Sequence, residues 1–323
     1  MCLFVPTMSF KLRARTYVPI IASAAVIGLA ALYLRSKEKK LLTEAPLKQA
    51  IKKEKKESSE PAPTPATTPV PKPVVPEKRK GPVKTIFKTK VQGSAGLCAY
   101  VVESAKAAIQ DREIFHLAVA GGSVLDALVY LKNYKSEVDF SKFVLSFVDH
   151  KCIPPEHDQA TAAKCKAKFV DESGISLVIM PVSTPQLGTD GSVEAEYYAE
   201  ELQGAGVPHD DSGFPVFDMV ILGLEEDGSV GCIHPMGPAV ATTDKTVAGS
   251  PKEEEPSSIT LTIESINNAL EVVVAAFGED KKEAVKRALK RPAEEPRGTY
   301  PAQLLKKPIY FLDKGAAAAV SVF

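Results

Sequence analysis

The chain has only five cysteines among its 323 residues, and no two of them form a CxxC pair. They are Cys2, Cys98, Cys152, Cys165 and Cys232. An odd number of widely spaced cysteines argues against a disulfide framework and against a structural zinc site. Reduced thiols in an intracellular compartment are the simpler interpretation.

A net charge is also missing, because 40 basic residues balance 40 acidic residues. No overall electrostatic field therefore attracts nucleic acid or an anionic substrate, and any anion site must be local. We expect no nucleic-acid partner. The length of the chain and its hydrophobic content of 45% favour one large domain with appendages.

Charged residues are absent from positions 17–34, and basic residues flank this run on both sides. The run is long enough for a transmembrane helix, so we expect an anchor at 17–34 behind a basic segment at 1–16. A cleaved signal peptide or an organelle presequence is the alternative. Basic residues are denser after the run, which predicts a single-pass membrane protein with its domain on the cytosolic, matrix or stromal side.

The composition of residues 35–83 changes from Lys/Glu-rich to Pro-rich, ending in PAPTPATTPVPKPVVPEKRKGP. Proline at this density disfavours both helix and sheet, so we expect a disordered, extended linker. The linker would hold a domain away from the membrane. A proline-rich ligand for a protein partner is a second interpretation of the same segment.

Short β-branched runs alternate with longer amphipathic stretches throughout residues 84–323. This pattern predicts a three-layer, Rossmann-like α/β domain with a mostly parallel sheet. The predicted strands are 115–120, 143–148, 177–180, 217–222, 259–263, 272–277 and 309–312. The predicted helices are 95–110, 124–131, 160–169, 193–202, 281–289 and 315–320. Ligands bind beyond the carboxyl ends of such strands, so the loops there are the candidate sites.

The first of these loops is the glycine loop, Ala120-Gly121-Gly122-Ser123. Its glycines allow close approach of a phosphate to the backbone, and Ser123 adds a hydroxyl. A tight turn that binds nothing also needs glycine. The loop alone therefore leaves both interpretations open.

Three further loops contain polar groups. In DHKCIPPEHD, which begins at Asp149, two histidines and a cysteine raise a zinc hypothesis, although the spacing matches no known ligand set. Lys151 could lower the pKa of Cys152, or the thiol could be inert. In LGLEEDGS, Asp227 could orient a water or a sugar hydroxyl, or the loop could be plain surface. Lys281 in GEDK could bind phosphate or be solvated.

Together these segments resemble the 6-phosphogluconolactonase family, particularly its plant-like branch, over most of residues 88–320. The shared segments are AGGS, DHKCIPPEHD for the family's DER-V-P, and SGFPVFDMVILGLEEDG for its F-D-L-LLGMGPDGH. Later segments are SITLTI, GEDKKEAVKRAL, YPAQLL and YFLDKGAAAAV. Glucosamine-6-phosphate isomerases share the glycine loop and the DGH element. The ending FLDKGAA looks more like the lactonase branch.

The resemblance implies hydrolysis of 6-phosphogluconolactone to 6-phosphogluconate, a step of the oxidative pentose phosphate pathway, with no metal or other cofactor. It implies that Gly121, Gly122, Ser123, Lys151 and Lys281 bind the substrate phosphate. The family's histidine after Asp-Gly acts as the general base.

The resemblance also implies that Asp149 and Asp227 are active-site carboxylates. The positions at which this chain differs from the family include its catalytic and phosphate-binding residues. Ser229 stands at the position of the histidine, and Lys151 stands at that of an arginine. A serine hydroxyl cannot take a proton from water without a base of its own. His234 is the candidate for a relocated base.

Two functional hypotheses follow from these departures. The first is a lactonase whose activity is weak or lost. The second is a non-catalytic, membrane-tethered module that binds sugar phosphate or a protein.

Overall fold

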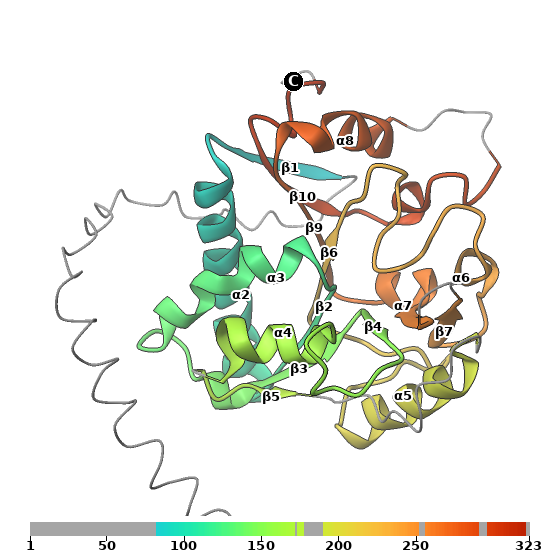
Figure 1. Ribbon diagram of the computed structural model, residues 1–323. Coiled ribbons are helices and arrows are strands. Elements are labelled where there is room, and N and C mark those ends of the chain that lie inside the picture. Colours follow the sequence, from blue (N-terminus) through green and yellow to red (C-terminus); the bar gives the residue numbers. More distant parts are fainter. Residues whose placement is uncertain (1–81, 172, 178–189, 252–255, 291–295, 321–323) are drawn as a thin grey trace, which may run out of the picture. The chain divides into compact units, whose positions relative to one another are not determined.

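The computed structural model describes residues 82–171, 173–177, 190–251, 256–290 and 296–320 (Figure 1). All of them belong to the second of two compact units, Pro69–Phe323. The predicted anchor at 17–34 and nearly all of the predicted linker lie outside the described residues. Within the described ranges, none of the helices combines the length and apolar character that crossing a membrane requires.

A parallel sheet of seven described strands forms the centre of the domain. In spatial order its strands are β1 (Val83–Phe87), β10 (Ile309–Asp313), β9 (Glu271–Ala276), β6 (Met219–Gly223), β2 (Phe115–Val119), β3 (Phe143–Phe147) and β5 (Ser176–Leu177). Every neighbouring pair runs parallel. All five residues of β2 are buried, as expected for a strand covered on both faces.

A smaller antiparallel sheet contains β4 (Asp149–Lys151), β8 (Ser258–Leu261) and β7 (Val247–Ser250). β4 follows directly after β3 of the large sheet. Because Asp149 pairs with Thr260 of β8, the small sheet fixes the chain just beyond the carboxyl end of β3.

Helices cover both faces of the large sheet. The α-helices are α2 (Lys90–Arg112), α3 (Ser123–Ala127), α4 (Thr161–Cys165), α5 (Ser192–Gly204), α6 (Pro238–Ala241), α7 (Ile263–Asn267) and α8 (Lys282–Leu289). Shorter turns are the 3₁₀ segments η1 (Leu128–Tyr134), η2 (Phe140–Lys142), η4 (Glu279–Lys281) and η5 (Pro301–Leu304), and the π segment η3 (Lys166–Val170). In Figure 1, α2 and α3 lie on one side of the sheet and α6 and α7 on the other. The predicted α/β class with a mostly parallel sheet is confirmed.

The sequence at the two ends of α2 determines where this helix begins and ends. The Thr89 hydroxyl accepts a hydrogen bond from the Gln92 N–H at 3.2 Å and caps the helix before Lys90. Glu113 has a left-handed backbone with φ of 62° and ends it. The helix therefore begins five residues earlier than the predicted start at 95.

The predicted helices 124–131 and 160–169 are α-helical only as far as Ala127 and Cys165 and continue as a 3₁₀ and a π segment. Residues 178–180 of the predicted strand 177–180 lie outside the described residues. Two further predicted elements differ from the structure. Residues 315–320 form turns rather than a helix, because Asp313 Oδ1 accepts hydrogen bonds from the N–H groups of Ala316 and Gly278 and ties the segment to the loop after β9. So short a stretch also gains little from helix propagation. The predicted strand at 259–263 belongs to the small antiparallel sheet, since its partners are β4 and β7.

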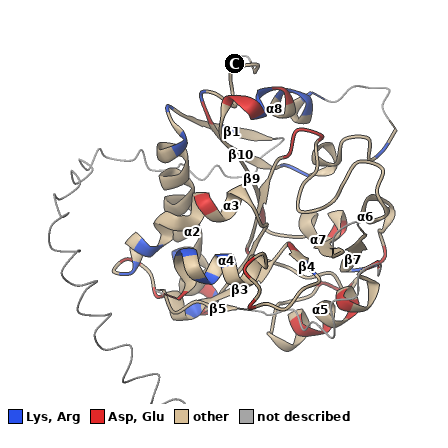
Figure 2. Ribbon diagram, viewed as in Figure 1, with Lys and Arg blue, Asp and Glu red and all other residues tan. Residues whose placement is uncertain are grey.

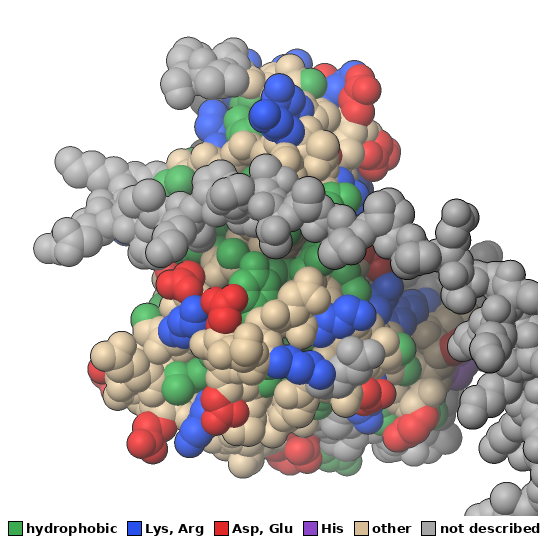
Figure 3. All heavy atoms as spheres, turned by 90° about the vertical axis from the view of Figure 1, so that its left-hand side faces the viewer, with side chains coloured by type: hydrophobic (Ala, Val, Ile, Leu, Met, Phe, Trp, Pro, Cys, Tyr) green, Lys and Arg blue, Asp and Glu red, His purple; other side chains and the backbone are tan. Residues whose placement is uncertain are grey.

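Charged side chains of both signs are distributed over the domain. Figure 2 shows acidic residues on α5 and a mixture of acidic and basic residues on α8. On the face turned toward the viewer in Figure 3, Lys and Arg side chains alternate with Asp and Glu side chains. This distribution agrees with the expectation that an anion site in this chain is local.

Candidate active site

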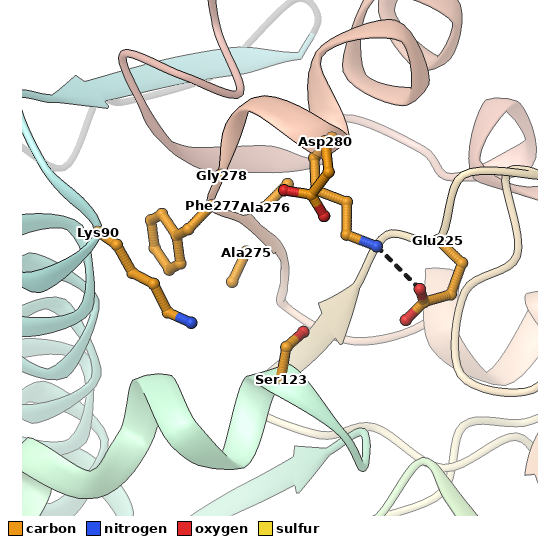
Figure 4. A pocket seen from close by; sticks show the side chains of 9 residues that line it. Lys90, Ser123, Glu225, Ala275, Ala276, Phe277, Gly278 and Asp280 are labelled. Carbon is orange, nitrogen blue, oxygen red and sulfur yellow. Dashed lines mark hydrogen bonds and ion pairs between the residues drawn. The ribbon is translucent and has the colours of Figure 1, made fainter.

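A pocket of about 400 Å³ lies where the loops after β1, β2, β6 and β9 meet (Figure 4). Its polar lining residues are Lys90, Ser123, Glu225, Asp280 and Lys281, and Phe277 adds an aromatic wall. β9, β6 and β2 are neighbours in the sheet, so their carboxyl ends bring these loops together. The pocket therefore brings together Ser123 of the glycine loop, Glu225 of the LGLEEDGS loop and Lys281, while Gly121 and Gly122 are not among its lining residues.

The glycine loop has the backbone conformation that only glycine adopts without strain. Gly122 has φ of 65° and ψ of −135°, and a Cβ at this position would meet no atom within 4 Å. Ser123 begins α3 and is exposed at the pocket. The N–H of Gly121 is already used, because it donates to Asp149 Oδ1 at 3.1 Å. The open space at this loop therefore lies next to Gly122.

Asp149 joins two of the loops. Its Oδ1 accepts the hydrogen bond from Gly121, and its Oδ2 accepts one from the thiol of Cys232 at 3.3 Å. Desolvation raises the pKa of Asp149, and these two hydrogen bonds offset part of that shift. Asp149 therefore positions the glycine loop relative to the loop after β6. It does not line the pocket.

Asp227 shapes the loop after β6. Its Oδ1 accepts a hydrogen bond from the N–H of Ser229 at 2.9 Å, while the N–H of Glu225 donates to the Ser229 carbonyl at 3.1 Å. Gly228 between them has φ of 89°. Asp227 is exposed and its position fixes a tight turn, which sets the direction of Ser229.

Ser229 is 3% exposed and points toward a histidine of the same loop. Its Oγ lies 3.1 Å from Nδ1 of His234. Within the described residues, Nε2 of His234 is buried and has no hydrogen-bond partner. Neither Ser229 nor His234 lines the pocket, so the imidazole lies next to the serine hydroxyl rather than at the pocket wall.

Lys281 does reach the pocket, and a carboxylate holds it there. Its Nζ lies 2.9 Å from Oε2 of Glu225, and the dashed line in Figure 4 marks this ion pair. The Lys281 side chain is 15% exposed and that of Glu225 is 61% exposed. Lys90 points into the same space from the start of α2 (Figure 4).

Sequence reasoning missed both Lys90 and Glu225. Lys90 follows β1, and β1 joins the sheet only through β10 at the other end of the chain. Glu225 stands in an acidic run that is typical of a solvated surface. Two signals located Lys281: GEDK stands at the start of a predicted helix, and the family resemblance implies a phosphate-binding lysine there.

The segment DHKCIPPEHD does not contribute to this pocket. Lys151 lies in β4, opposite Ser258, and is not among the lining residues. His150 is buried, with Nδ1 2.6 Å from the Lys151 carbonyl and Nε2 3.4 Å from the N–H of Ala162. Burial lowers the pKa of His150, which favours a neutral ring that donates from Nδ1 and accepts at Nε2.

The structure favours the inert-thiol interpretation of Cys152. Burial raises its pKa to about 12, so its thiol is inert at neutral pH despite the neighbouring Lys151. In the part of the chain that the structure describes, no group of three or more His, Cys, Asp or Glu residues is placed to hold a metal ion.

The fold and the pocket define an α/β domain with a polar pocket at the carboxyl ends of parallel strands. The family model described as Glucosamine-6-phosphate isomerases/6-phosphogluconolactonase matches residues 88–310. The chain belongs to this family, and the resemblance to 6-phosphogluconolactonases is confirmed.

Two relatives and one solved structure illustrate the similarity. The protein named Probable 6-phosphogluconolactonase 2 from Oryza sativa subsp. indica is 25% identical over 257 residues, which cover 75% of this chain and 91% of the relative. A 6-phosphogluconolactonase from Streptomyces coelicolor is 32% identical over 207 residues, covering 62% and 75%. The crystal structure of 6-phosphogluconolactonase from Leishmania guyanensis has a TM-score of 0.65 at 20% identity, covers 75% of this chain and 100% of that one, and shares the fold.

Proposed function

We propose that the domain binds a sugar phosphate of the 6-phosphogluconolactone type and that its lactonase activity is weak or lost. One observation supports this most strongly: Ser229, at the position of the family's histidine, is buried and hydrogen-bonded to His234. A hydroxyl cannot serve as general base at neutral pH, and loss of a general base costs about 10²- to 10⁴-fold in rate.

Binding groups remain at the pocket. Lys90 and Lys281 supply positive charge, and Ser123 beside Gly122 supplies a hydroxyl and a close approach to the backbone. A δ-lactone is already activated toward water, so a pocket that holds and orients it gives modest acceleration through proximity and charge. Weak hydrolysis and pure binding are therefore two ends of the same proposal.

Thermal unfolding in the presence of 6-phosphogluconate tests the binding part. A stabilising shift that Lys281→Ala abolishes supports the pocket, because a ligand that binds only the native state raises its stability. Lys282→Ala is the matched control. Lys282 is the next residue, pairs with Glu279 at 3.1 Å, and does not line the pocket. Absence of any shift at millimolar ligand contradicts the proposal.

We also propose that residues 17–34 tether the domain to a membrane through the spacer at 35–83, with the domain on the cytosolic, matrix or stromal side. The support is the uncharged run with its basic flanks. Fractionation of the full chain with a C-terminal tag tests this. Recovery of uncleaved protein in the carbonate-resistant membrane pellet supports the tether, and a shortened soluble product supports processing instead.

A further inference from the structure

The ion pair between Lys281 and Glu225 forms part of the wall of the pocket. Lys281 is largely buried, with 15% of its side chain exposed, while Glu225 reaches it from the loop after β6. Figure 4 shows the carboxylate of Glu225 at one side of the pocket, at the end of the dashed line that marks the ion pair. The carboxylate therefore stands where an anionic group of a ligand would meet Lys281.

The charges of the pocket cancel. Lys90 and Lys281 bring two positive charges, and Glu225 and Asp280 bring two negative ones. A phosphate placed against Lys281 would lie beside the Glu225 carboxylate, and like charges at such short range repel. Glu225 is 61% exposed, so its side chain can turn away into solvent without unfolding the loop.

We propose that Glu225 is a specificity-determining residue that occupies the anion position of the pocket, so that a ligand phosphate binds only by displacing its carboxylate from Lys281. This inference rests on the proposed function, in which the pocket takes a sugar phosphate. Its consequence is a weakened preference for the phosphorylated sugar acid over the same sugar acid without phosphate.

Calorimetric titration of the full chain tests this, with 6-phosphogluconate, inorganic phosphate and gluconate as separate probes. Glu225→Gln removes the charge and Glu225→Ala removes the side chain. We expect each variant to bind 6-phosphogluconate and phosphate about 10-fold more tightly and to bind gluconate with unchanged affinity. Adding Lys281→Ala to Glu225→Gln should remove the gain.

Glu226→Gln is the matched control, because Glu226 is the adjacent exposed glutamate and does not line the pocket. Its affinities should equal those of the unaltered chain. An equal gain in Glu226→Gln and Glu225→Gln would reveal only a general charge effect and would overturn the inference.

The remaining outcomes separate the inference from the proposed function. If the unaltered chain and both Glu225 variants bind 6-phosphogluconate equally, the inference is wrong and the sugar-phosphate function stands. If folded Glu225→Gln and Glu225→Ala proteins bind no 6-phosphogluconate at millimolar concentration, both are wrong. Thermal unfolding of each variant establishes that it is folded.

Discussion

Oγ of Ser229 lies 3.1 Å from Nδ1 of His234, so the two residues form a hydrogen-bonded pair within one loop. The pair places an imidazole close to the position where the family has its histidine. Because Ser229 is buried and neither residue lines the pocket, the imidazole is used in the structure of the loop. Substitution of the two residues therefore tests whether His234 acts as a relocated general base.

A double-mutant cycle on Ser229→Ala and His234→Ala should give a coupling free energy of about 1 kcal/mol in urea unfolding, the usual size for a hydrogen bond. Residual lactonase activity of His234→Ala should stay within about 3-fold of the unaltered chain, since an imidazole that stabilises the loop makes no contact in the transition state. A much larger rate loss with unchanged stability would identify His234 as the base.

Asp149→Asn should change how stability depends on pH. Desolvation raises the pKa of Asp149 in the folded protein, so folding favours its protonated form. Its contribution is fully present below the unfolded pKa of about 3.9 and is lost as pH rises through the raised folded value. The asparagine side chain keeps an oxygen for the Gly121 N–H and cannot ionise. The difference in urea midpoint between Asp149→Asn and the unaltered chain should therefore grow in favour of the variant as pH rises above about 4. A constant difference across this range would contradict the desolvation argument.

Gly122→Ala should lower the free energy of unfolding by about 1 to 3 kcal/mol, because its positive φ is unfavourable for residues with a Cβ. Gly206→Ala is the matched control, with φ of 76° and an open environment; its neighbours do not line the pocket, whereas Gly122 directly precedes the pocket residue Ser123. Both variants should lose stability in urea unfolding. Only Gly122→Ala should weaken binding of 6-phosphogluconate, and equal affinities in the two variants would argue against phosphate binding at the glycine loop.

Cys152 should resist alkylation in the folded protein. Burial leaves its side chain 3% exposed and raises its pKa to about 12. The reagent therefore cannot reach the sulfur, and little of the thiol is ionised. Peptide mass spectrometry after iodoacetamide treatment at pH 8 should find it unmodified until urea is added. Rapid modification of the native protein would contradict the inert-thiol interpretation.

Most strands of the large sheet were predictable from sequence because they are short, apolar and buried on both faces, as β2 and β9 illustrate. The edge strand β1 was missed, since none of its five residues is buried. The glycine loop was predictable because it follows a strand directly, and Lys281 because GEDK stands at the start of a predicted helix and matches a lysine that the resemblance implies. The ion pair between Glu225 and Lys281 was not predictable from sequence. The two residues are 56 positions apart and meet only because β6 and β9 are neighbouring strands.

The sequence likewise did not predict that the Ser229 side chain points toward His234, although His234 is only five residues away. That direction depends on the turn that Asp227 and Gly228 build. β4 was missed because a strand of three residues with two charged side chains has no apolar periodicity, and its pairing with β8 alone defines it.

The most direct measurement is the initial rate of 6-phosphogluconolactone hydrolysis by the purified chain and by Ser229→His. The exchange variant Ser229→His/His234→Ser is measured beside them, because it frees the space that His234 fills. We predict that at least one of the two variants exceeds the unaltered chain by about 10²-fold or more, the contribution of a general base. Hydrolysis by the unaltered chain as fast as that of both folded variants would contradict the account.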